Sequence, residues 1–163
     1  MRLNIGCGIK IREGWTNIDI TDNGQEIVSD IRTLPLDDNV AVEAEAIHVI
    51  EHFNVWEAEG LIKEWFRVLK PGGVLRVEFP EFQKVLDTIK RMKDTTAEDA
   101  LTYLYGALYG DFKYENPYMT HLWCFQAKDI ALLMSQIGFG FVYVGAPLYH
   151  RHERDVAVVG VKP

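Results

Sequence analysis

Short apolar runs alternate along this chain with longer segments of helical periodicity, and this alternation limits the fold more than any other feature. The apolar runs, each bounded by Gly, Asp or Asn, lie at residues 2–5, 16–20, 26–31, 46–50 and 74–79. Short runs with little polar alternation are typical of parallel strands that are buried on both faces. The pattern predicts an α/β fold with a Rossmann-like open sheet that is mostly parallel.

Helical periodicity is clearest over residues 55–69, where apolar side chains recur every three or four positions and Asn54 and Glu57 form a capping pair. Further helices are predicted at residues 82–92, 97–109 and 128–137, the last ending at Gly138. Residues 139–145 and 155–161 are predicted as an antiparallel pair at one edge of the sheet. Because strands and helices alternate, helices are expected on both faces of the sheet.

The composition fits one globular domain rather than a nucleic-acid or membrane protein. With 17 Lys and Arg against 24 Asp and Glu in 163 residues, the formal net charge is −7, whereas binding to nucleic-acid phosphates needs clustered positive charge. The sequence has no apolar run of the ~18 residues that span a bilayer and no apolar signal at its start. We therefore expect a single cytoplasmic domain over residues 1–163, without nucleic-acid or membrane partners.

A glycine turn, Gly6-Cys7-Gly8, directly follows the first predicted strand, and Asp19 ends the second. Glycines let backbone amides approach a ligand closely, and a carboxylate at a strand end can accept both hydroxyl hydrogens of a ribose. The pair indicates an adenosine-containing ligand. A turn without a ligand is the simpler alternative, because Gly-x-Gly alone is a weak signal. The Cys7 thiol is interpreted as structural, with a nucleophile as the alternative.

The spacing of these residues favours S-adenosylmethionine (SAM) over a dinucleotide. Gly6 and Asp19 are 13 positions apart, whereas the dinucleotide fingerprint has about 20 and a third glycine. Residues 9–14 are too few for a crossover helix of ordinary length, and a pyrophosphate is usually held at the N-terminus of that helix. SAM carries no phosphate, so a shortened or absent first crossover helix suits it better.

Five segments together resemble the class I SAM-dependent methyltransferases, in particular their compact predicted members. The segments read LNIGCG, GWTNIDI, SDIRTLPLDD, IHVIEHF and EWFRVLKPGGVLRVEFPEF. The resemblance covers residues 2–82 well and residues 137–139 more loosely. It implies a cofactor site made of Asn4, Gly6, Cys7, Gly8, Asp19, Asp30, Ile31 and His48.

In that site, the resemblance places the glycine turn against the methionine part and the sugar of SAM, with Asp19 on the ribose hydroxyls. Asp30 and Ile31 are implied to hold the adenine, and His48 to lie close to the ligand. The family usually starts its glycine motif with an acid that binds the amino-acid end of SAM, and Asn4 replaces that acid here.

The carboxyl ends of parallel strands form the ligand-binding edge of such a sheet, which brings Glu51, His52 and His121 to the predicted mouth. Methyl transfer needs an aligned acceptor and, for some acceptors, a base, a task that suits histidine near neutral pH. These three residues are the catalytic candidates, with a purely structural role as the alternative for each histidine.

The string His48-x-x-Glu51-His52 also contains three residues that can bind a metal ion. No metal is expected there, and a divalent ion is the alternative.

Residues 103–125 are rich in aromatic side chains, and residues 110–119 lack helical periodicity. We predict an aromatic lid or acceptor wall within residues 95–125, which suits a small or carbohydrate-like acceptor. The resemblance points the same way, because compact relatives are often linked with polysaccharide and envelope pathways.

The sequence therefore predicts a SAM-dependent methyltransferase that acts on an oxygen or nitrogen nucleophile of a small or glycan-related acceptor. One alternative is a SAM-binding module without catalysis. Another is a nicotinamide-dependent sugar-nucleotide enzyme, whose Tyr-x-x-x-Lys pair is matched by Tyr109 and Lys113. Those two residues straddle the predicted end of a helix, so their side chains are not expected to share a face.

Overall fold

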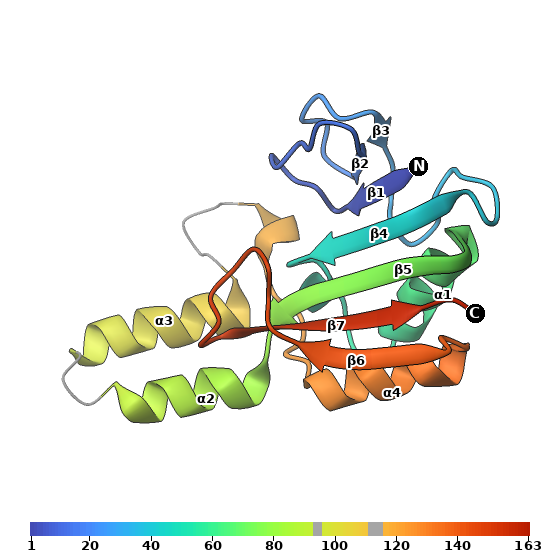
Figure 1. The fold of residues 1–163 in the computed structure, drawn as a ribbon. Coiled ribbons are helices and arrows are strands. Elements are labelled where there is room, and N and C mark those ends of the chain that lie inside the picture. The colour runs from blue at the N-terminus through green and yellow to red at the C-terminus, as the bar shows by residue number, and fades with distance from the viewer. Residues whose placement is uncertain (93–95, 111–115) are drawn as a thin grey trace.

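Seven strands form one sheet in the order β3-β2-β1-β4-β5-β7-β6 in the computed structural model, which describes residues 1–92, 96–110 and 116–163 (Figure 1). The strands are β1 (Arg2–Ile5), β2 (Thr16–Asp19), β3 (Ile27–Val28), β4 (Ala41–Ile47), β5 (Leu69–Pro80), β6 (Phe141–Gly145) and β7 (Asp155–Val161). Neighbours among the first five are parallel, and β7 runs antiparallel to both β5 and β6. The Rossmann-like, mostly parallel sheet with an antiparallel edge pair is confirmed.

Three strands differ clearly from their predicted bounds, and one of them is β5, which occupies residues 69–80 rather than 74–79. β3 is only two residues long, and β4 occupies residues 41–47 rather than 46–50. Glu43 and Glu45 interrupt the apolar pattern of β4, although their charges are paired with Arg2 and Arg12. Because β4 ends earlier than predicted, the residues after it form a short 3-10 helix, η1 (Ile50–His52), which carries two of the catalytic candidates.

The described residues contain four α-helices, namely α1 (Ala58–Val68), α2 (Phe82–Arg91), α3 (Ala97–Tyr109) and α4 (Ala127–Ile137). The Asn54 and Glu57 pair predicted as a cap does form, since the Glu57 carboxylate accepts hydrogen bonds from the backbone and side-chain nitrogens of Asn54 at 3.0 and 3.1 Å. It closes a turn that precedes α1 rather than its first turn. Of the helices in the described ranges, none combines the length and hydropathy that crossing a bilayer requires.

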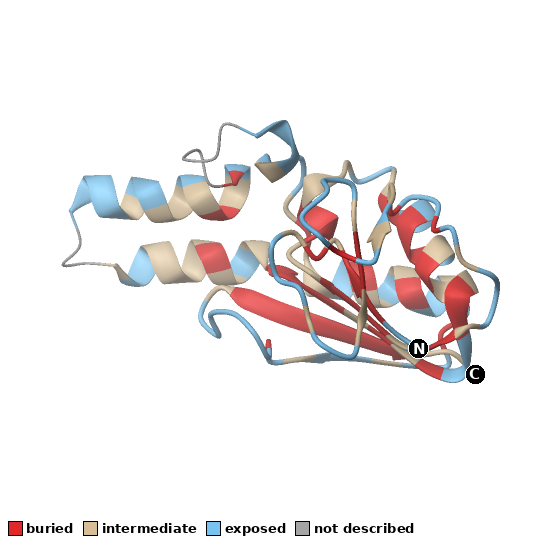
Figure 2. Cartoon of the chain, turned by 90° about the horizontal axis from the view of Figure 1, so that it is seen from above, coloured by how far each residue is buried: buried red, intermediate tan, exposed pale blue. Residues whose placement is uncertain are grey.

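The hydrophobic core lies between the sheet and helices α1 and α4. These two helices contact each other and the sheet, and Trp65, Phe79 and Met134 in this layer are fully buried. Burying one such side chain stabilises the fold by about 2 kcal/mol. Figure 2 shows that buried residues are concentrated in the strands and in the sides of the helices that face them. Helices α2 and α3 instead pack on each other beyond the carboxyl end of β5 (Figure 1).

The opposite face of the central strands carries charged side chains that loops cover. Glu45 of β4 is paired with Arg12, and its carboxylate lies 3.6 Å from the Nε of Arg76 on β5. The Arg12 guanidinium in turn lies 4.3 Å from the ring centroid of Tyr149. Helices were expected on both faces, but α1 and α4 share one face. The reason is the short first connection, residues 6–15, which contains no helix, as its length predicted.

Candidate functional site

The glycine turn after β1 is held in a conformation that requires glycine. The amides of Gly6 and Cys7 both donate to the carbonyl of Ile18 on β2, at 2.8 and 3.0 Å. Gly6 has a φ of +66°, and a Cβ added there would stand 2.6 Å from a methyl carbon of Val49. Gly8 also has a positive φ, yet a Cβ there would meet no atom within 4 Å. The turn is therefore packed on its Gly6 side and open on its Gly8 side.

Asp19 lies against this turn, as the sequence predicted. Its Oδ2 accepts a hydrogen bond from the amide of Gly8 at 2.8 Å, and its Oδ1 accepts one from the amide of Thr21 at 2.9 Å. A carboxylate oxygen has more than one acceptor position. Asp19 is half-buried, so the group keeps room to accept from a ribose while its own orientation is fixed.

Asn4 and Cys7 serve the shape of the turn. Both amide hydrogens of buried Asn4 are used, on the carbonyl of Lys10 at 2.9 Å and on Oδ1 of Asn17 at 2.8 Å. Burial, with the nearby Asp19 charge, raises the pKa of the Cys7 thiol to about 11. A thiol with that pKa is protonated at neutral pH and is a poor nucleophile, which fits the structural interpretation of Cys7.

The adenine candidates follow β3 at the same edge of the sheet. Asp19 pairs with Val28, and the amide of Ser29 donates to the Asp19 carbonyl at 2.9 Å. The carboxylate of Asp30 accepts from the backbone and the guanidinium of Arg32; burial opposes its ionisation, but these bonds lower its pKa. Ile31 is 7% exposed and belongs to the core. Their role in binding adenine stays a prediction.

His48 follows β4 in a strained backbone conformation, with a φ of +54°. Its Nδ1 lies 3.0 Å from a carboxylate oxygen of Glu51, and its Nε2 lies 3.5 Å from one of Asp155. Burial of the ring disfavours its charged form, but the two carboxylates outweigh burial and raise the pKa of His48 to about 9. The Nε2 of His48 also lies 3.4 Å from a guanidinium nitrogen of Arg154, a group that can only donate.

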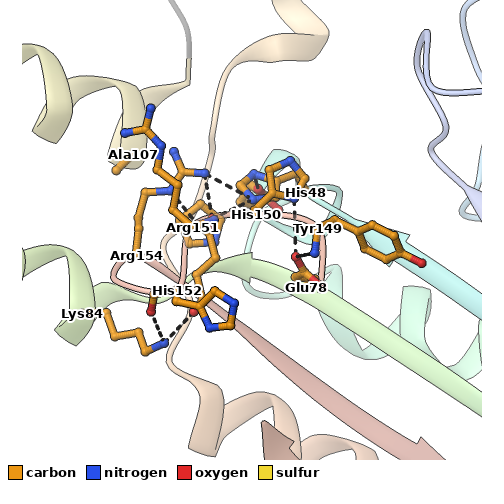
Figure 3. A network of polar contacts seen from close by, with 12 residues as sticks. His48, Glu78, Lys84, Ala107, Tyr149, His150, Arg151, His152 and Arg154 are labelled. Carbon is orange, nitrogen blue, oxygen red and sulfur yellow. Dashed lines mark hydrogen bonds and ion pairs between the residues drawn. The ribbon is translucent and has the colours of Figure 1, made fainter. Parts of the chain in front are cut away.

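Sequence reasoning missed the partners that surround His48 (Figure 3). Arg154 donates to both oxygens of Asp155, at 2.7 and 2.9 Å. Burial opposes ionisation of Asp155, but His48 and Arg154 hold its pKa at about 2. The only local signal for these residues is the charged run at residues 151–155, which directly precedes an apolar strand.

Glu78 is a second missed acid, and it anchors the loop of residues 146–154. The amides of Leu148 and Tyr149 donate to its carboxylate at 2.9 and 3.2 Å. The same loop stacks His150 on His48, with ring centroids 4.0 Å apart (Figure 3). A lone acid inside the apolar fifth strand is the signal that sequence analysis left unused.

The three catalytic candidates come together from segments far apart in the chain. Glu51 is 2% exposed, and its carbonyl accepts from the amides of Leu122 and Trp123 at 2.7 and 3.2 Å, which ties His121 to η1. The Nε2 of His121 lies 4.0 Å from a Glu51 carboxylate oxygen, and the rings of His52 and His121 meet edge to face. Burial lowers the pKa of His121 despite the Glu51 charge, so that ring is neutral at neutral pH.

An open hollow of about 480 Å³ lies beside His121, between α2, α3 and α4. Its walls include Phe82, Tyr109, His121, Trp123, Cys124 and Gln126. Aromatic rings from the predicted acceptor wall thus line a space next to the catalytic candidates. Residues 111–115 of that predicted segment, and with them Lys113, lie outside the described residues.

Comparison with known proteins finds one family model that matches part of the chain and several solved structures with a similar fold. Residues 7–77 match a family model described as a methyltransferase domain. No curated protein matches the chain significantly.

Several solved structures match nearly the whole chain. A SAM-dependent methyltransferase from Archaeoglobus fulgidus is 14% identical, with 98% of this chain and 85% of that one covered and a TM-score of 0.65. A SAM-dependent methyltransferase from Methanosarcina mazei is 20% identical, with 98% and 91% covered and a TM-score of 0.64. A possible histamine N-methyltransferase from Thermotoga maritima is 18% identical, with 99% and 81% covered and a TM-score of 0.63. At these identities the likeness shows the fold alone.

Proposed function

We propose that this chain, which carries a SAM-dependent methyltransferase domain with the class I Rossmann-like fold, transfers the methyl group of SAM to an oxygen or nitrogen atom of a small or carbohydrate-like acceptor. The observation that carries the proposal is the contact between Gly8 and Asp19. It aligns a carboxylate with an open, glycine-lined turn at the carboxyl ends of β1 and β2, where an adenosine ligand of such a sheet binds.

The absence of a helix between β1 and β2 supports SAM rather than a dinucleotide. The loop of residues 6–15 offers no helix N-terminus for a pyrophosphate. The nicotinamide alternative depends on the pair Tyr109 and Lys113. Of these two residues, Tyr109 is the last residue of α3 and lies in the wall of the hollow.

The acceptor is assigned to the hollow beside Glu51, His52 and His121. Its lone pair forms a bond to the methyl carbon while the carbon–sulfur bond breaks and its electron pair returns to sulfur, which gives S-adenosylhomocysteine. Alignment of the two reactants supplies most of the acceleration in such a displacement. We assign His121, with Glu51 beside it, as the group that accepts the proton lost by the acceptor. His121 is neutral at neutral pH, and its Nε2 faces the Glu51 carboxylate.

Aromatic rings support a ring-bearing or carbohydrate-like acceptor. Tyr109 and Trp123, both exposed, lie in the wall of the hollow. Flat aromatic faces pack against the apolar faces of sugar rings while polar groups at the rim bind their hydroxyls. A basic amine is the second acceptor class, because the wall of the hollow also carries the acid Asp129.

Two measurements test the proposal. Calorimetry with SAM, S-adenosylhomocysteine and NAD should show binding of the first two and none of NAD. Formation of S-adenosylhomocysteine should then be followed with a panel of sugars, sugar nucleotides, hydroxy acids and amines at saturating SAM. Failure to bind SAM contradicts the proposal. Tight SAM binding with no turnover across the panel favours the non-catalytic module.

A further inference from the structure

Glu51 is a buried carboxylate that protein groups leave unsatisfied. It is 2% exposed, and neither of its oxygens accepts a hydrogen bond from the residues that the structure describes. The Nδ1 of His48 stands 3.0 Å from one of these oxygens, yet no hydrogen bond joins the two groups. A buried carboxylate is costly unless charge and hydrogen bonds, or a metal ion, compensate it. Glu51 is therefore oriented for a cationic partner that the protein itself supplies only in part.

Two imidazole nitrogens face the same point. The Nδ1 of His52 lies 3.1 Å from the carbonyl of Thr120, and the Nδ1 of His121 lies 3.0 Å from the carbonyl of Ala107. A carbonyl only accepts, so each Nδ1 carries the proton and each Nε2 keeps its lone pair. A backbone carbonyl that orients one ring nitrogen is the usual companion of a metal-ligating histidine, because it fixes the ring and directs the other nitrogen to the metal.

The geometry points to a binding site for one divalent transition-metal ion, held by Glu51, His52 and His121, whose ligand atoms lie within 4.8 Å of one another. Two imidazoles and one carboxylate suit Zn²⁺, Mn²⁺ or Fe²⁺, whereas Mg²⁺ and Ca²⁺ prefer oxygen ligands throughout. The sequence led us to expect no metal, with a divalent ion at the string His48-x-x-Glu51-His52 as the alternative.

His48 stands beside the proposed site and is not one of its ligands. Both of its ring nitrogens face carboxylates, Glu51 on one side and Asp155 on the other. The ligand set therefore includes only two of the three residues in the string His48-x-x-Glu51-His52.

Resting on the proposed function, the site favours an acceptor with an oxygen donor, because a bound hydroxyl gains most from losing its proton before it attacks the methyl carbon. Three protein ligands leave coordination positions open, and His121 is also a wall residue of the hollow. An acceptor hydroxyl bound there would have a lowered pKa and lose its proton to water in the open hollow. The alkoxide then bonds to the methyl carbon, and the carbon–sulfur pair returns to sulfur. With the ion bound, the two histidines are ligands, so water in the hollow takes the proton in place of His121.

The test is metal binding by the tag-free full chain after dialysis against a chelator. Titration with ZnCl₂ and MnCl₂ at pH 7.5 should show one ion per chain, and MgCl₂ should bind far more weakly. His52→Ala and His121→Ala should each weaken Zn²⁺ binding by about tenfold or more, because each removes a ligand. His152→Ala, which removes an exposed histidine outside the cluster, is the matched control and should bind as the wild type does.

A spectroscopic readout makes the test independent of how the variants fold. CoCl₂ added to the wild-type chain should give visible absorption bands typical of a four- or five-coordinate site with nitrogen ligands, and excess ZnCl₂ should remove them. Zn²⁺ that does not bind, or binds equally well to wild type and a folded His52→Ala variant, overturns the site. SAM calorimetry separates the two proposals, since SAM binding without metal binding overturns only the metal site, and the reverse overturns only the methyltransferase proposal.

Discussion

The backbone amide of Gly8 donates a 2.8 Å hydrogen bond to the carboxylate of Asp19, which joins the turn after β1 to the end of β2. Asp19 therefore has two functions, one in the loop and one in ligand binding. Asp19 closes the loop, through Gly8 and Thr21, and presents its remaining acceptor positions at the open side of the turn. A substitution at Asp19 therefore affects both loop order and ligand affinity, and a test has to separate them.

Replacing Asp19 with Ala should weaken SAM binding by about tenfold or more, because the ribose loses a charged acceptor. Calorimetry measures the affinity, and the thermal midpoint reports loop and domain stability. Asp22→Ala is the matched control, since Asp22 is an exposed acid in the next loop whose recorded side-chain contact is the amide of Gly24. Unchanged SAM affinity in folded Asp19→Ala would refute the ribose assignment.

Gly6→Ala should destabilise the fold by about 2 kcal/mol, because alanine is strained at a φ of +66° and its Cβ would collide with Val49. Gly8→Ala carries only the backbone strain, because nothing lies near its Cβ position, and should cost about 1 kcal/mol. Urea unfolding measures both. Adding Val49→Ala to Gly6→Ala should recover part of the loss, and no recovery would show that the collision is not the cause.

Neither cysteine should react readily with iodoacetamide in the folded protein at pH 8. Burial raises the pKa of Cys7 to about 11 and that of Cys124 to about 12, with nearby carboxylates adding to the shift. The reactive thiolate is then a small fraction, and its amount should grow about tenfold per pH unit. Mass spectrometry of the alkylated chain, with urea-unfolded protein as the control, measures this. Fast labelling of Cys7 at pH 8 would revive the nucleophile alternative.

Asp155→Asn should remove stability that depends on pH in the acid range. The pKa of Asp155 falls from an ordinary value of 3.8 to about 2 in the fold, so its contribution is complete above pH 4 and is lost as pH falls towards 2. By linkage the contribution is about 2 kcal/mol. Unfolding free energies of wild type and variant should therefore differ by about that amount at pH 6 and converge near pH 2. A gap that does not change with pH would contradict the role of the carboxylate charge.

Trp123→Ala should raise the KM for the acceptor by about tenfold and leave SAM affinity unchanged, since Trp123 is a wall residue of the hollow and no residue of the glycine turn is. Trp56→Ala is the control, because Trp56 is 74% exposed and is not a wall residue. Steady-state kinetics with the best acceptor of the panel measures the effect. An unchanged KM, or equal effects of the two substitutions, would place the acceptor elsewhere.

Local features of the sequence were enough to predict several elements and the cofactor turn. α3 and β7 have the predicted bounds, because their periodicity and their flanking residues are local signals. The pairing of Gly8 with Asp19 was also foreseeable, since two adjacent parallel strands joined by a short loop must bring their ends together. The missing first helix followed from the number of residues between the strands.

The sequence left the surroundings of His48 open. Glu78, Arg154 and Asp155 had no recognisable spacing, because a contact between residues 70 or more positions apart leaves no period in the chain. β4 was misplaced for a related reason, as its glutamates look polar in the sequence and are neutralised only by Arg2 and Arg12 in the fold.

By itself, then, the amino-acid order determined the sheet, the glycine turn and the acid that faces it, since all three depend on short-range periodicity, chain length and backbone freedom. The sequence placed Glu51, His52 and His121 at one edge of the sheet. Only the tertiary structure decided that their ligand atoms lie within 4.8 Å of one another, because the segment at residues 120–123 docks on η1 through hydrogen bonds to backbone carbonyls. Backbone hydrogen bonds do not depend on which side chains are present, so no pattern in the sequence predicts them.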